Sequence, residues 1–147
     1  MKLLEVRTIK EIETCVDMYI SLNNFLPTDR KVAISNLSLA VRRKKFVRTL
    51  HKSDRIVAWI YADIIHMQHA SDKILYQHYY CSILNGILAY RAIEILHSAM
   101  YDFAIDNNCD LVISSGSFMD ETFVFPRILE KLGWSRKGYM CMRRVQQ

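Results

Sequence analysis

NGILAYRAIEILHSAMYDFAIDNNCDLVISSGSFMDETFVFPRILEKLGWSRKGYMCMRRVQQ, residues 85–147, is the stretch that says most about the fold class of this chain. Apolar residues at helical spacing predict a long helix over residues 88–107. The short apolar run at 111–115 predicts a strand that is buried on both faces of a sheet. A second helix is expected to end within 129–134, and a last strand is expected around 139–145.

The middle of the chain predicts the sheet that receives these elements. Three runs rich in β-branched and aromatic residues, at 46–50, 56–66 and 73–84, are separated by short polar links, which is typical of an antiparallel meander. A strand, a helix of about 20 residues and another strand then form a right-handed crossover between parallel neighbours. The predicted fold class is therefore α/β (α+β): a mixed, mainly antiparallel central sheet flanked by helices.

The N-terminal part predicts a strand and two helices. Residues 2–7 read as a short strand, and Thr8 followed by Glu11 has the form of a capping box. The helix that they begin is expected to end near residue 24. Pro27 opens a second helical region that reaches about residue 45, with Thr28 or Asp29 as its N-cap and with an interruption allowed near 35–36. No repeat or shift in composition divides the chain, so we expect a single domain over residues 1–147.

Composition excludes several classes of protein. Hydrophobic residues make up 51% of the chain and charged residues 24%, which is typical of a globular protein. No two of the four cysteines form a CxxC pair, which argues against a zinc ribbon or finger and favours free buried thiols. His66 and His69 have HxxH spacing without a further ligand nearby, so no metal site is predicted. No signal-peptide stretch or membrane span is evident, and we expect a cytoplasmic protein without a membrane partner.

The net charge of +5 indicates attraction to phosphate-bearing partners. Basic residues gather at 42–45, at Arg48 and at 143–144. A solvated helix face is the simplest interpretation of the run at 42–45. Nucleic acid is a weaker alternative, because no aromatic residues are interleaved with the basic ones.

The order of elements resembles the GNAT (GCN5-related N-acetyltransferase) superfamily over essentially the whole chain. Two segments add to the resemblance. Tyr79-Tyr-Cys-Ser-Ile83 is similar to the strand end in members of the histone-acetyltransferase type, and Leu129-Glu-Lys-Leu-Gly-Trp134 resembles the family's Tyr-Glu-Lys-x-Gly-Phe. The resemblance implies an acyl-CoA N-acyltransferase-like fold that takes acetyl-CoA as a co-substrate. Its pantetheine arm is expected at the splayed strand end, and its pyrophosphate at the start of the following helix.

The resemblance also implies which residues bind the cofactor. The family's phosphate loop, Gln/Arg-x-x-Gly-x-Gly/Ala, falls on residues 87–92, where only the final Ala92 matches. Tyr90 stands where glycine lets the backbone approach the phosphates, while Arg91 could supply a charge and Gly86 a turn. The candidate cofactor-binding residues are Cys81, Ser82, Ile83, Ile87, Leu88, Ala89, Tyr90, Arg91, Ala92 and Ser115.

The catalytic positions of the family are only partly matched. Leu129 occupies the place of the tyrosine that protonates the departing thiolate, and Gln77 the place of a carboxylate base. His78 is adjacent, and imidazole is the usual base at neutral pH. Because neighbouring strand residues point to opposite faces, His78 can replace Gln77 only if the strand slips or bulges. The candidate catalytic residues are His78 and Tyr80.

Two functions are compatible with the resemblance and with the residues that depart from it. The first is an N-acyltransferase that moves an acetyl group from acetyl-CoA to an amine of a small molecule or protein. The alternative is a catalytically inactive GNAT-fold protein that binds a protein or nucleic acid, which the altered phosphate loop and Leu129 favour. A monomer and a homodimer are both compatible with the sequence.

Overall fold

The computed structural model describes residues 1–22, 27–66, 72–115, 124–137 and 140–146. Within them lies a seven-stranded sheet in the order β1-β2-β3-β4-β5-β7-β6. The elements are β1 (Lys2–Glu5), α1 (Ile9–Leu22), α2 (Arg30–Arg42), β2 (Phe46–Lys52), β3 (Arg55–His66), β4 (Lys73–Ser82), α3 (Gly86–Asp106), β5 (Leu111–Ser115), α4 (Val124–Lys131), β6 (Ser135–Lys137) and β7 (Met140–Arg144).

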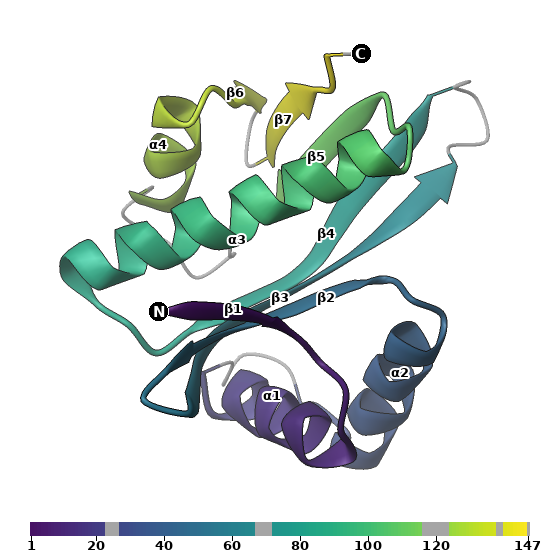
Figure 1. Cartoon of the computed structure of the whole chain (residues 1–147), viewed down its shortest axis with the longest axis vertical. Coiled ribbons are helices and arrows are strands. Elements are labelled where there is room, and N and C mark those ends of the chain that lie inside the picture. Colours follow the sequence, from purple (N-terminus) through teal and green to yellow (C-terminus); the bar gives the residue numbers. More distant parts are fainter. Residues whose placement is uncertain (23–26, 67–71, 116–123, 138–139, 147) are drawn as a thin grey trace.

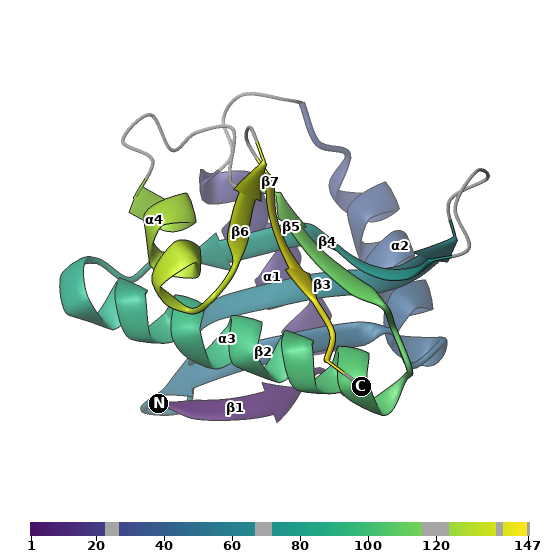
Figure 2. The ribbon, with the colours of Figure 1, turned by 90° about the horizontal axis from the view of Figure 1, so that it is seen from above.

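The topology confirms the predicted fold class. β4 and β5 run parallel and are connected by α3, whereas the other neighbouring strands are antiparallel. The strand predicted at 111–115 lies between β4 and β7, as expected of a strand buried on both faces (Figure 2). Figure 1 shows α3 across one face of the sheet and α1 and α2 on the opposite face.

Each face of the sheet has its own core. Strand side chains alternate between the faces, so β2, β3 and β4 each contribute to both cores. The face under α3 and α4 buries aliphatic residues, and the face under α1 and α2 buries a second cluster around Trp59. The first cluster includes Leu50, Ile60, Leu75, Leu96, Met100, Val112 and Leu129, and the second includes Val16, Leu37, Val47, Trp59 and Cys81.

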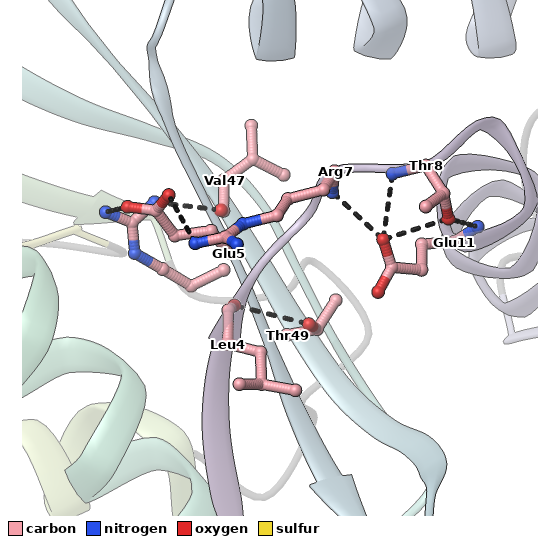
Figure 3. Close-up of polar contacts among 8 residues, drawn as sticks. Leu4, Glu5, Arg7, Thr8, Glu11, Val47 and Thr49 are labelled. Atoms are coloured by element: carbon pink, nitrogen blue, oxygen red, sulfur yellow. Dashed lines mark hydrogen bonds and ion pairs between the residues drawn. The ribbon is translucent and has the colours of Figure 1, made fainter.

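Both N-terminal helices begin with a side-chain cap. The amides of Arg7 and Thr8 donate to Oε2 of Glu11 at 2.9 Å each, and the Glu11 amide donates to the Thr8 hydroxyl at 3.2 Å (Figure 3). This confirms the predicted capping box. Partial burial works to raise the pKa of Glu11, but these backbone hydrogen bonds outweigh it and lower the pKa. At α2 the cap is Asp29, which accepts from two backbone amides, and the helix continues through residues 35–36 without a break.

Two features differ from the sequence-based expectation. The long helix begins at Gly86 rather than near residue 88, and Gly86 has a φ of +58°, which L side chains disfavour. The short strand β6 was not predicted, because three polar residues carry no apolar pattern.

The four cysteines agree with the prediction of free buried thiols. All four cysteines are free and buried. Among the residues that the structure describes, none of the helices has the length and apolar character that crossing a membrane requires.

Candidate active site

β4 and β5 pair only along their first few residues. The last pair in register is Tyr76 with Ile113, although β4 continues to Ser82. Beyond this pair, Gln77 and Ser114 are joined by a 2.6 Å hydrogen bond between the Ser114 hydroxyl and the Gln77 side-chain amide. In the described part of the chain, no strand pairs with this edge of β4 after Tyr76.

The unpaired edge of β4 presents specific backbone groups. The Ile83 amide donates to the Val57 carbonyl on β3 at 3.0 Å. In an antiparallel pair, opposed residues alternate between pairs that exchange backbone hydrogen bonds and pairs that do not. Because Ile83 is hydrogen-bonded to β3, the N–H and C=O groups of Ser82 and Tyr80 point away from β3. They therefore face the edge that β5 leaves open.

The start of α3 follows directly after this edge. The Ala89 amide donates to the Asn85 carbonyl, which closes the first turn, and the Asn85 side chain does not cap the helix. The amides of residues 86–88 consequently have no acceptor within the helix. A helix start of this kind carries a partial positive charge and binds anions.

The segment predicted to form the phosphate loop is helical. Ile87 is 71% exposed in the first turn of α3, and Arg91 is exposed one turn later. Tyr90 packs against the core, and Ala92 is fully buried. Only the beginning of the segment thus offers backbone amides to a ligand, while Arg91 can offer its side chain.

A β-bulge lies at the end of the paired region. Tyr61 of β3 opposes Tyr79, but the next residue, Ala62, opposes Gln77, so His78 is the extra residue. The bulge turns two consecutive side chains to the face of α1 and α2. Tyr61 stacks on His78 with ring centroids 4.9 Å apart and on Tyr79 at 6.2 Å. A bulge is therefore present, but it leaves His78 on the face opposite Gln77, which bonds His97 of α3, so His78 does not take the place of Gln77.

A cavity of about 550 Å³ lies between this face and the helices α1 and α2. His78 lines it, and burial lowers the pKa of its imidazole, with Asp63 opposing the shift and Lys45 adding to it. Lys45 also forms an ion pair with Asp63. The neutral imidazole at pH 7 can accept a proton. The lining residues are Val16, Tyr19, Pro27, Thr28, Asp29, Val32, Ala33, Asn36, Leu37, Leu39, Ala40, Arg43, Lys45, Trp59, Tyr61, His78 and Tyr79.

Trp59 lines the cavity and also carries a buried donor without an acceptor among the described residues. Its side chain is 2% exposed, and its indole N–H has no acceptor among the described residues. Leaving a buried donor unpaired costs about 1–3 kcal/mol.

Comparison with known proteins is informative only at the level of structure. No protein-family model matches the sequence, and no curated protein matches it. Solved structures do match. A ribosomal-protein-alanine N-acetyltransferase from Brucella melitensis superposes with a TM-score of 0.73 at 9% identity, covering 99% of this chain and 100% of that one. The aminoglycoside 6'-N-acetyltransferase from Enterococcus faecium superposes at 0.71 and 11% identity, with 100% and 98% covered. This chain has the GNAT fold.

On the GNAT fold, the candidate residues of the strand end are divided between the two faces. Cys81 is buried among the α1 and α2 residues, where burial raises its pKa to about 12, and its backbone opposes Trp59 of β3. It is therefore turned away from the open edge. The Ser82 hydroxyl accepts from the Leu84 amide at 3.1 Å, and Ile83 is exposed. Ser115 lies on β5, and its side chain is outside the described set.

Tyr80 is on the opposite face of β4 from His78, so the structure does not bring the two catalytic candidates together. Its ring contacts His97 and Phe125 at centroid distances of 5.5 and 5.3 Å. Its hydroxyl is buried without a hydrogen-bond partner among the described residues. Burial raises the pKa of Tyr80, although the nearby Ser82 hydroxyl opposes the shift. Leu129 is fully buried and offers no proton.

Sequence reasoning missed His97, which completes a buried polar cluster at the point where β4 and β5 separate. Its Nδ1 lies 2.9 Å from the Ile93 carbonyl oxygen and its Nε2 2.8 Å from the Gln77 amide. Full burial lowers the pKa of His97 to about 4, despite the bond to Ile93, so the ring is neutral at pH 7. The Gln77 atom placed against Nε2 is the side-chain oxygen, which also accepts from the Ser114 hydroxyl at 2.6 Å. The Ser114 hydroxyl is a second partner at 3.3 Å.

Proposed function

We propose that this protein transfers an acetyl group from acetyl-CoA to a primary amine. One observation carries the proposal: β4 has an open edge beyond Tyr76, and a bulge at the same point turns His78 into a cavity. A thioester at the open edge and an amine in the cavity would approach each other around one strand. The similarity of this fold to solved N-acetyltransferase structures supports the proposal.

The cofactor is assigned to the open edge and the start of α3. The outward-facing peptide groups of Tyr80 and Ser82 would pair with the amides of the pantetheine arm. The free amides of residues 86–88 would hold the pyrophosphate, and Arg91 would add a positive charge beside them. Acetyl-CoA is thus the proposed co-substrate.

The chemistry needs a base and a route for the leaving thiolate. His78 takes a proton from the attacking amine as the new C–N bond forms and the C–S bond of the thioester breaks. Tyr80 keeps its proton because burial raises its pKa, and it is the candidate donor to the thiolate. Positioning the two reactants contributes much of the acceleration.

Thermal unfolding with and without acetyl-CoA tests the proposal. At about 100 times its dissociation constant, a ligand of the native state adds about 2.7 kcal/mol, which for a domain of this size raises the melting temperature by about 5–11 °C. Arg91→Glu should reduce that rise. Lys31→Glu makes the same change of charge on α2, on the opposite face of the sheet, and should leave the rise unchanged.

The alternative function is a GNAT-fold module that binds a protein or nucleic acid and transfers nothing. The buried Leu129, which cannot protonate a thiolate, favours it. Absence of a thermal shift at millimolar acetyl-CoA would reject the transferase and support this alternative.

A further inference from the structure

We infer that the acceptor is an amine that carries both an aromatic or large apolar body and an anionic group, as an aromatic α-amino acid does. This inference rests on the proposed function, because it takes the cavity beside His78 as the acceptor site. Three properties of the cavity wall support this inference: its aromatic side chains, an arginine without a partner among the described residues, and the positions of these groups along the cavity.

Aromatic rings form much of the inner wall. Tyr61, Tyr79 and Trp59 line the cavity from the sheet, and Tyr19 of α1 meets Tyr79 edge-to-face at 5.0 Å. The facing side of α2 adds aliphatic carbons, including those of Leu37. A flat apolar group between these surfaces gains both buried area and favourable contacts between rings.

Among the Asp, Lys and Arg side chains that the structure describes along the cavity wall, only that of Arg43 has neither a hydrogen bond nor an ion pair. Asp29 accepts hydrogen bonds from the amides at the start of α2, and Lys45 is paired with Asp63. The guanidinium of Arg43 has no hydrogen bond or ion pair within the described residues, and Arg43 is exposed. An arginine fork matches the two oxygens of a carboxylate.

The order of these groups favours an amine and a carboxylate on the same carbon. Arg43 ends α2, and Lys45 follows it and reaches Asp63, which opposes Tyr76 beside the bulge that carries His78. The anion site and the base are therefore at the same end of the cavity. Trp59 lies four residues before Asp63 on β3, about 13 Å away at the usual rise per strand residue. This distance leaves room for the ligand's side chain over Tyr61.

Binding of two matched ligands tests the inference. L-phenylalanine and phenethylamine share the ring and the amine, and only the first has a carboxylate. By isothermal titration calorimetry we expect the wild-type protein to bind L-phenylalanine about tenfold more tightly, consistent with a charge-assisted hydrogen bond. Arg43→Gln should remove the preference and leave phenethylamine unaffected. Arg42→Gln, an exposed neighbour that does not line the cavity, is the control and should keep the preference.

The outcomes separate this inference from the proposed function. Equal binding of both ligands, binding of neither, or a preference that survives Arg43→Gln would overturn the inference, even if acetyl-CoA raises the melting temperature. A preference that depends on Arg43 in a protein unaffected by acetyl-CoA would support the assigned ligand class and reject the transferase. Tyr61→Leu should weaken binding of both ligands, and no effect on either would remove the aromatic part of the inference.

Discussion

Replacing His78 by Gln is expected to lower kcat for acetyl transfer by about 10²–10⁴-fold, the usual contribution of a general base. Glutamine keeps the approximate size and polarity of the side chain, but it cannot take a proton from the amine. The affinity for acetyl-CoA should not change, because His78 faces the cavity of α1 and α2 and the cofactor is assigned to the open edge. His66→Gln, which removes a β3 histidine that does not line the cavity, should leave kcat unchanged.

The pH dependence of kcat provides a second measurement on the same residue. Burial places the pKa of His78 below 6.5, so the base is neutral at pH 7 and becomes protonated as the pH falls. The wild-type rate should therefore be flat above neutrality and should fall in acid below pH 6.5. The residual activity of His78→Gln should lack that fall. Full activity in the variant, or an identical pH profile, would exclude His78 as the base.

Acid should destabilise the wild-type protein more than a His97→Leu variant. The pKa of His97 is about 4 in the folded state, against 6.5 for a histidine that nothing perturbs. The unfolded chain therefore binds more protons between these values, and stability falls as pH decreases through this window. The difference of pKa corresponds to about 3 kcal/mol lost between pH 7 and pH 4. Leucine does not titrate, so the variant should lose about 3 kcal/mol less.

Urea unfolding at pH 7 and pH 4 measures this difference directly. Carboxylates titrate in both proteins and cancel in the comparison, so the absolute cost of the substitution does not matter. If His97→Leu fails to fold, His97→Gln serves the same purpose, since its side chain is also without charge. Parallel loss of stability in the wild type and the variant would show that His97 is not held neutral by burial.

Much of the fold follows from local patterns. The capping box of Thr8 and Glu11 is predictable because its two residue types and their spacing satisfy specific backbone amides. The strand at 111–115 and the long helix before it predict the parallel crossover, because few other connections are compatible with right-handed topology. The helix start was misplaced because a left-handed glycine at residue 86 leaves no periodic signal.

The candidate site was less predictable, since it depends on contacts between elements. Residues 76–80 include three tyrosines and a histidine, so aromatic side chains occur on both faces and the alternation cannot reveal a bulge. His97 lies within the apolar stripe of α3, where only the facing Gln77 and Ser114 make it a polar cluster. The sequence does not indicate which of Arg42 and Arg43 faces a binding site. The structure does, because Arg43 is the C-cap of α2 and lines the cavity.

Amide hydrogen exchange with and without acetyl-CoA tests where the cofactor binds. We expect slower exchange at the backbone amides of Tyr80 and Ser82 and in the first turn of α3, residues 86–88, because these are the groups assigned to pantetheine and pyrophosphate. Exchange in α2 should not change. Unaltered exchange at the β4 edge and the start of α3, or protection confined to the cavity between α1 and α2, would contradict the proposed cofactor site.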